Sequence, residues 1–193
     1  SQKSIVIVGG GKVATKRAST LIEYCDDVHI VSPIISTTLK ELLDNEIITW
    51  SQKEFEPQDV EHADLVVIAT NNNDVNTKVL ESVPHHALCN HASKAQVGNV
   101  SIPSILKRGK LSISVSTNGA SPKLNKKIIS RISDMYDESY EMYIDFLYES
   151  RQLIKRLSIE PSRKQELLQH ILSDEYLDEV KQQEFTRWLH LQV

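Results

Sequence analysis

Short apolar runs alternate with amphipathic stretches along the first half of the chain. The runs are rich in Val and Ile and nearly continuous, as in strands buried on both faces. They are SIVIV at 4–8, VHIVS at 28–32, EIITW at 46–50, DLVVIA at 64–69 and ALCNH at 87–91. The stretches at 12–24, 37–44 and 74–83 have helical spacing. Repeated strand–helix–strand units predict an α/β fold with a Rossmann-like parallel sheet and right-handed crossovers.

The pattern changes in the second half. KLSISVS at 110–116 alternates apolar and polar residues, as in a strand with one wet face. Ser121 and Pro122 form a helix start, and from Lys123 we predict helix almost to the end, with interruptions near 159–162 and at 173–174. Aromatic residues recur there at helical spacing, which favours a packing face over a ligand site. They are Tyr136, Tyr140, Tyr143 and Phe146–Tyr148.

Charge is distributed unevenly along the chain. The formal net charge of −4 argues against a nucleic-acid binder. Between 101 and 131, however, every charged residue is basic, which indicates an anionic small-molecule ligand or an acidic surface as partner. A solvated basic face that balances the acidic C-terminal third is the other interpretation. The basic residues are Lys107, Arg108, Lys110, Lys123, Lys126, Lys127 and Arg131.

Composition and segment lengths bear on the location of the protein. With 40% hydrophobic residues and 25% charged residues the chain is typical of a globular protein. No apolar run approaches the roughly 18 residues of a membrane span, and residues 1–4 do not form a secretory signal. Two cysteines, Cys25 and Cys89, fit a reducing compartment. We therefore expect a cytoplasmic protein that does not bind a membrane.

A glycine-rich turn follows the first predicted strand. Gly9, Gly11 and Ala14 form a G-x-G-x-x-A pattern in strand–turn–helix context. Gly9 allows the tight turn, Gly11 leaves room for a pyrophosphate, and Ala14 lets the helix pack closely on the strand. The N–H groups at the start of the helix then face the phosphates. This arrangement predicts a dinucleotide site.

The ends of the second and fourth strands give weaker signals. An NAD site usually presents Asp or Glu after the second strand, where this chain has Ser32 and Pro33. Ser32 is able to hydrogen-bond a ribose, whereas Lys12 is able to approach a 2′-phosphate, so these residues leave NAD and NADP open. Residues 70–73, Thr-Asn-Asn-Asn, fall at the carboxyl edge of the sheet, either as cofactor contacts or as an ordinary Asn-rich turn.

Several of these motifs together resemble the precorrin-2 dehydrogenase family, which includes the N-terminal module of siroheme synthase and related bifunctional dehydrogenase/chelatases. The motifs are GGGKVATKRAS at 9–19, IATNNNDVN at 68–76, LCN at 88–90, PSIL at 103–106 and SVSTNGASPKL at 114–124. The resemblance implies NAD-dependent oxidation of precorrin-2 to sirohydrochlorin on the way to siroheme. It also implies a homodimer with a Rossmann domain at 1–110, a dimerisation region at 111–147 and a helical C-terminal domain at 148–193.

The resemblance also implies roles for individual residues. Lys12, Val13, Pro33 and Ile34 match family cofactor contacts, and Thr70 and Asn71 are expected near the nicotinamide. Because precorrin-2 is a polycarboxylate, the resemblance implies that the basic segment at 101–131 binds the substrate. The expected substrate contacts are Asn90, Ser116, Thr117, Asn118, Gly119, Ser121, Lys123 and Lys126.

One departure from the family pattern concerns catalysis. The family places an Asp three residues after the Asn of the fifth strand, and here Ser93 stands at that position. His91 is the obvious chemical substitute, and a proton released to solvent is the alternative. Chelation suffers more from this loss, so we expect a dehydrogenase without chelatase activity, and a separate chelatase is one partner that would take its product. A bifunctional enzyme that inserts ferrous iron and a non-catalytic nucleotide- or tetrapyrrole-binding module are the other hypotheses.

A group of metal-ligand residue types lies close to this departure. His85, His86, Cys89 and His91 do not have the spacing of a structural zinc site, and a helix end and a strand aim them in different directions. We therefore predict no metal site there.

Overall fold

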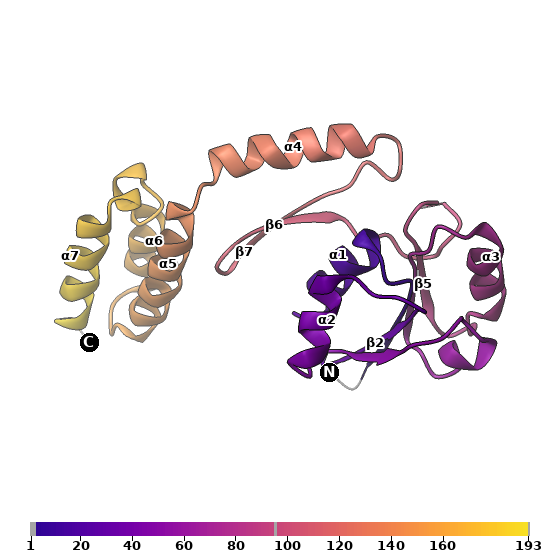
Figure 1. Cartoon of the computed structure of the whole chain (residues 1–193). Coiled ribbons are helices and arrows are strands. Elements are labelled where there is room, and N and C mark those ends of the chain that lie inside the picture. Colours follow the sequence, from indigo (N-terminus) through magenta and orange to yellow (C-terminus); the bar gives the residue numbers. More distant parts are fainter. Residues whose placement is uncertain (1–2, 95, 193) are drawn as a thin grey trace. The chain divides into compact units, whose positions relative to one another are not determined.

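The computed structural model describes residues 3–94 and 96–192 of the chain. Its packing divides the chain into two units. The first unit extends to Ile102 and also contains Asn118–Ala120, and the second comprises Pro103–Thr117 and the chain from Ser121 onward. Figure 1 shows the helices and strands of both units.

The first unit is built on a five-stranded parallel sheet. Its strands lie in the order β3-β2-β1-β4-β5, which confirms the α/β fold and the Rossmann-like parallel sheet. The strands are β1 (Ser4–Val8), β2 (Asp27–Val31), β3 (Thr49–Ser51), β4 (Leu65–Ile68) and β5 (Leu88–His91). The connecting helices are α1 (Lys12–Leu21), α2 (Thr37–Asp44), the short 3₁₀ helix η1 (Pro57–Val60) and α3 (Asn73–Ser82).

Both faces of this sheet are covered, which explains the continuous apolar strands. Ile7 and Ile30 pack with Ala14, Ala18 and Leu39, so α1 and α2 cover one face. The opposite face is covered by side chains from α3, η1 and the segment after β3; Val79, Val60 and Phe55 are among them. Full burial of each Val, Ile or Phe contributes about 1.5–3 kcal/mol, so the two clusters stabilise the sheet from both faces.

The second unit begins with an antiparallel hairpin of β6 (Ser104–Arg108) and β7 (Leu111–Val115). Gly109 adopts φ +52° at its turn. Helix α4 (Pro122–Met135) follows, with the Ser121 side chain accepting from the Leu124 N–H. Asn125 Nδ2 donates to Ser104 Oγ at 3.0 Å, which links α4 to β6. Among its residues, all of which the structure describes, α4 contributes no buried side chain.

The rest of the second unit is helical. Its elements are α5 (Ser139–Arg156), α6 (Pro161–His170), the 3₁₀ helix η2 (Asp174–Leu177) and α7 (Glu179–His190). Tyr143 and Phe146 are buried in a core with Ile154, Tyr176 and Leu189, which confirms the predicted packing face for these two aromatics. Tyr148, in contrast, is half exposed. The predicted domain boundary between 147 and 148 falls inside α5.

Four details of the predicted elements were wrong. The third strand lies at 49–51 rather than 46–50, because Glu46 adopts φ +58° just after α2. The first helix ends at Leu21 rather than at 24. Strand β6 was not predicted, and the helix expected from Lys123 is broken at 136–138, where Asp137 Oδ1 accepts from the Ser139 N–H. None of the described helices is long and apolar enough to cross a bilayer.

Candidate functional site

A cavity of about 430 Å³ lies in the first unit, around the ends of β1, β2 and β4 and the segments that follow them. Carboxyl ends of parallel strands are where open α/β sheets bind ligands. Glycines, small polar residues and a few apolar side chains line it. The lining residues are Val8, Gly9, Gly10, Gly11, Lys12, Val13, Val31, Ser32, Pro33, Ile34, Glu54, Phe55, Ala69, Thr70, Asn71, Asn72 and Val75.

The turn after β1 brings the backbone close to two neighbouring segments. Gly9 adopts φ +122°, and a Cβ there would collide with the backbone carbonyl of Ala69. A Cβ on Gly10 would collide with the Ile34 carbonyl. Gly11 differs, because a Cβ there would meet nothing within 4 Å. The first two glycines therefore serve the fold, and Gly11 leaves open space on the cavity side.

The start of α1 suits an anion. Gly11 is its N-cap, no side chain caps its first turn, and its first turn holds no acidic residue. In α2 and α3, by contrast, Ser36 and Asn72 accept from the first-turn N–H groups. The uncapped N–H groups and the positive end of the helix dipole therefore face a glycine-walled cavity that Lys12 also lines. These residues fit the pyrophosphate of a dinucleotide.

The turn after β2 is held by its own hydrogen bonds. Ser32 is 8% exposed, and its hydroxyl donates to the Ile34 carbonyl at 2.8 Å. Pro33 and Ile34 are exposed and line the cavity. Ser32 therefore has its proton engaged within the turn, which leaves only its lone pairs for a ribose.

The segment after β4 presents backbone and amide groups. Thr70 Oγ1 donates to Asn76 Oδ1 at 2.6 Å and accepts from the Asn72 N–H at 3.1 Å. The Thr70 hydroxyl is thus occupied inside the loop, whereas Asn71 is exposed and lines the cavity. Hydrogen bonds of this loop fix the rim on which a nicotinamide is expected.

All of the predicted cofactor residues except Ala14 come together in this one cavity. Ala14 is fully buried and packs on the sheet, as its place in the glycine-rich pattern requires. The sequence analysis offered Asn72 only as part of the segment 70–73, and it missed seven further lining residues, which are Val8, Gly10, Val31, Glu54, Phe55, Ala69 and Val75. Gly10 stands inside the glycine-rich motif, which is a signal that was available. Glu54 and Phe55 follow β3, for which the motif gives no signal.

The end of β5 brings the proposed catalytic residues together. His91 is 4% exposed, and its Nδ1 lies 3.4 Å from the hydroxyl of the exposed Ser93. Burial, and to a smaller extent the charge of Lys94, holds the pKa of His91 below its usual range. A lowered pKa favours the uncharged imidazole at pH 7, in which one ring nitrogen is able to accept a proton. Asn90 donates to the Val100 carbonyl at 3.0 Å, while its buried Oδ1 has no described partner.

The histidines near β5 do not gather around a metal. His85 and His86 are exposed, whereas Cys89 is buried, and burial raises the pKa of its thiol. Among the described residues, no group of three or more His, Cys, Asp or Glu side chains is placed to hold a metal ion.

The loop before α4 holds the remaining predicted substrate residues. Thr117 Oγ1 accepts from the Ser121 N–H at 3.3 Å, and Asn118 and Gly119 have positive φ values. Lys123 and Lys126 are exposed on α4, as are Lys127 and Arg131. None of these four cations forms an ion pair with any described residue. Their charge is available to an anionic ligand.

Comparisons with known proteins match three family models along the chain and several named relatives. Residues 1–104 match the family described as putative NAD(P)-binding, 108–132 the sirohaem biosynthesis protein central family, and 140–185 the SirC C-terminal domain family. The precorrin-2 dehydrogenase of Priestia megaterium is 40% identical over 184 residues, which cover 95% of this chain and 91% of the relative. The chain belongs to the precorrin-2 dehydrogenase family.

Other members of the precorrin-2 dehydrogenase family agree with this assignment. The protein of that name from Bacillus subtilis is 34% identical, covering 78% of this chain and 93% of its own length. A solved structure titled "SirC, precorrin-2 dehydrogenase" has a TM-score of 0.85 and 38% identity, and covers 97% of this chain and 94% of that one. The siroheme synthase of Nitrosomonas europaea is 25% identical over 93% of this chain but only 38% of its own length.

Proposed function

We propose that this chain is an NAD-dependent oxidoreductase that converts precorrin-2 to sirohydrochlorin in siroheme biosynthesis. The observation that carries the proposal is the glycine-walled cavity at the uncapped start of α1, in a chain of which 95% aligns with a precorrin-2 dehydrogenase. Precorrin-2 loses two hydrogens in this reaction. One leaves with its electron pair as hydride and reduces NAD⁺ to NADH, and the other leaves as a proton.

The chain's own residues position the cofactor. The first-turn N–H groups of α1, Gly11 and the Lys12 ammonium hold the pyrophosphate. Pro33 and Ile34, which line the cavity, would pack against the adenosine end of the bound cofactor, while Thr70 and Asn71 would form the rim beside its nicotinamide. Valine and phenylalanine side chains in the wall exclude water from the cofactor.

The proton leaves through the pair at the end of β5. Ser93 is exposed and accepts the substrate proton on Oγ while its own hydroxyl proton passes to the neutral Nδ1 of His91. The lowered pKa of His91 keeps the imidazole neutral before the step, and the step requires the tautomer whose lone pair is on Nδ1. Release of the proton directly to water is the alternative, and variants of both residues separate the two routes.

The basic face of α4 binds the carboxylates of the substrate. Lys123, Lys126, Lys127 and Arg131 fall on one side of the helix and have no described ion-pair partner. Unpaired surface cations are the groups that charge-assisted hydrogen bonds to carboxylates require. The residues 116–121 before the helix and Asn90 complete the set of substrate contacts that we propose.

The active species is a homodimer formed through α4 and the β6–β7 hairpin. A two-stranded hairpin is at best marginally stable alone. The apolar stripe of α4 stays half-buried or exposed within one chain; it consists of Leu124, Ile128, Ile132 and Met135. A second copy of the same segment would cover this stripe. The two cysteines are free, which fits a reducing compartment such as the cytoplasm.

Anaerobic turnover of precorrin-2 tests the proposal. The wild-type protein is mixed with precorrin-2 and NAD, then with NADP, and both NADH formation and sirohydrochlorin absorbance are followed. We expect equal amounts of NADH and sirohydrochlorin without any metal. Parallel reactions with ferrous or cobalt ion then test whether the chain consumes its product or leaves it to a separate chelatase. Tight binding of both ligands without any NADH would instead support a non-catalytic binding module.

A further inference from the structure

One acidic side chain lines the cofactor cavity, and the proposed function has not used it. Glu54 follows β3 and is exposed at the cavity wall. In many NAD sites a carboxylate at the end of the second strand receives the ribose 2′-hydroxyl, and this chain has Ser32 and Pro33 there. Because the Ser32 hydroxyl already donates to the Ile34 carbonyl, the turn after β2 supplies no carboxylate and no free hydroxyl proton.

The segment that leads to Glu54 is fastened to that same turn. The Ser32 N–H donates to the Ser51 carbonyl at 3.3 Å, and Trp50 Nε1 donates to the Ser32 carbonyl at 2.9 Å. Gln52 Nε2 donates to the Pro33 carbonyl at 3.4 Å. Three hydrogen bonds therefore hold the chain just before Glu54 against the turn where the ribose of a bound dinucleotide is expected.

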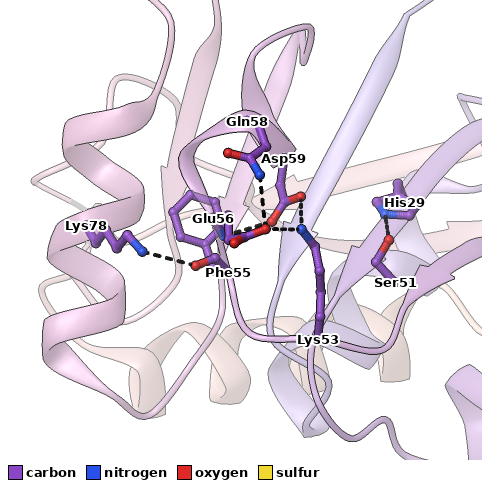
Figure 2. Close-up of polar contacts among 8 residues, drawn as sticks. All are labelled: His29, Ser51, Lys53, Phe55, Glu56, Gln58, Asp59 and Lys78. Carbon is purple, nitrogen blue, oxygen red and sulfur yellow. Dashed lines mark hydrogen bonds and ion pairs between the residues drawn. The ribbon is translucent and has the colours of Figure 1, made fainter.

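The residues on either side of Glu54 are also anchored, as Figure 2 shows. Lys53 Nζ lies 2.7 Å from Glu56 Oε2 and 2.8 Å from Asp59 Oδ1. Lys78 Nζ donates to the Phe55 carbonyl at 3.3 Å, and the Phe55 ring is buried in the core. With both neighbours fixed, the backbone of Glu54 has little freedom and its side chain projects from a defined point.

The charge of Glu54 is not neutralised by its surroundings. The nearest cation in sequence, Lys53, is shared by two acids, and its hydrogen bonds to Asp59 and then Glu56 raise its pKa. Glu54 forms no ion pair or hydrogen bond with any described residue. Lys12 and Glu54 are the only charged residues among the described residues of the cavity lining. Lys12 belongs to the phosphate end, so a net negative group remains beside the turn after β2.

We propose that Glu54 is the cofactor-specificity residue, which accepts a hydrogen bond from the adenosine ribose 2′-hydroxyl and repels the 2′-phosphate of NADP. The inference rests on the proposed use of a nicotinamide dinucleotide by this cavity. The carboxylate comes from the segment after β3 instead of the end of β2. Ser32 and Lys12 leave the choice between NAD and NADP open. The carboxylate of Glu54 favours NAD.

Isothermal titration calorimetry without substrate tests this assignment. NAD and NADP are titrated into the wild-type protein, Glu54→Gln and the control Glu61→Gln, which neutralises an exposed acid of the same unit that does not line the cavity. We expect Glu54→Gln to bind NAD about tenfold more weakly and NADP about tenfold more tightly, since it loses a charged acceptor and a repulsion. The Glu61→Gln protein should keep the wild-type ratio of the two affinities.

Two fragments locate the effect on the ribose. Adenosine 5′-phosphate and adenosine 2′,5′-bisphosphate lack the nicotinamide, so the same change in their affinity ratio on Glu54→Gln would support the assignment. An NAD-to-NADP ratio within about twofold of the wild type in Glu54→Gln would overturn it. If the wild-type protein bound neither dinucleotide, the proposed function itself would fail, whatever the Glu54 variant did.

Discussion

The apolar side chains of the parallel sheet in the first unit and those of helix α4 in the second differ in how far one chain buries them. In the sheet, Ile7, Ile30 and Val66 are fully buried between layers of the same chain. In α4, no side chain is buried among residues that are all described, although Ile128 and Ile132 lie on one stripe. The sheet is therefore covered within one chain, whereas we propose that a second copy of the chain covers the stripe of α4. Under the proposed function, nucleotide binding and subunit assembly therefore rest on segments with different sources of stability.

The largest effect is expected at the glycine-rich turn. Gly9→Ala forces a residue at φ +122° against the Ala69 backbone, which should destabilise the first unit by about 2–4 kcal/mol and abolish NAD binding. Gly11→Ala is the matched variant, because its Cβ enters open space. It should keep the melting temperature and lose at least about tenfold in NAD affinity. Calorimetry and thermal unfolding separate the two, and equal melting temperatures for both variants would contradict this division.

A charge on the apolar stripe of α4 should act on assembly alone. Ile132→Asp places a carboxylate in an apolar contact that is expected twice in a symmetric dimer. The dissociation constant of the dimer should therefore increase more than about 100-fold. Light scattering after gel filtration should report a monomer, while NAD affinity stays within about twofold. Ser130→Asp adds the same charge to an exposed position of the same helix and should leave the dimer intact. A wild-type protein that is already monomeric would refute the dimer.

The pair at the end of β5 should control turnover without affecting cofactor affinity. His91→Asn and Ser93→Ala should each lower kcat about tenfold or more and leave NAD affinity unchanged. Ser93→Asp should at least match wild-type turnover, since a carboxylate accepts the proton directly. Because the pKa of His91 is lowered, the neutral form persists below pH 6.5, so kcat should stay constant to more acidic pH than an ordinary histidine allows. Unchanged kcat in both variants would favour proton release to water.

The smallest effect concerns His29 on β2, which pairs with the edge strand β3. Its Nδ1 lies 2.7 Å from Thr49 Oγ1 and its Nε2 2.9 Å from Ser51 Oγ. Burial lowers the pKa of His29, assisted by Lys53 and opposed by Asp59 and Asp27. The folded state therefore binds a proton less readily than the unfolded state, and stability decreases as pH falls below about 6.5.

His29→Gln should make the free energy of unfolding less dependent on pH between pH 7 and pH 5. Urea unfolding at several pH values measures this, with His62→Gln as the control because it removes an exposed imidazole of the same unit. A slope for His29→Gln as steep as that of the wild type would show that His29 does not contribute.

The sequence predicts the sheet well because its signals are local. Continuous Val and Ile runs and the glycine-rich turn specify buried parallel strands and a phosphate site without knowledge of the rest of the chain. Strand β6 was missed because its form depends on pairing with β7 through the turn at Gly109, and its Lys107 and Arg108 were assigned to the basic segment. Pairing between segments is not visible in a single stretch of residues.

The candidate site shows the same limit. Its predicted cofactor residues follow β1, β2 and β4, where a motif or an expected strand end identified them. Glu54 depends on how the segment after β3 is tied to Ser32 and Pro33 by three hydrogen bonds, which no periodicity encodes. The helix break near Asp137 is similar, since it depends on one side chain that accepts from the Ser139 N–H.

The placement of the two thiols has a practical consequence. Cys25 and Cys89, the only cysteines of the chain, are both buried beside the parallel sheet, and Cys25 Sγ donates to the Lys3 carbonyl at 2.8 Å. An alkylating reagent reaches them only when the sheet opens, so labelling kinetics measure the opening of the first unit alone. The rate of thiol labelling therefore reports the opening of the first unit without any added probe. Binding of NAD should lower this rate, whereas opening of the helices of the second unit should not change it.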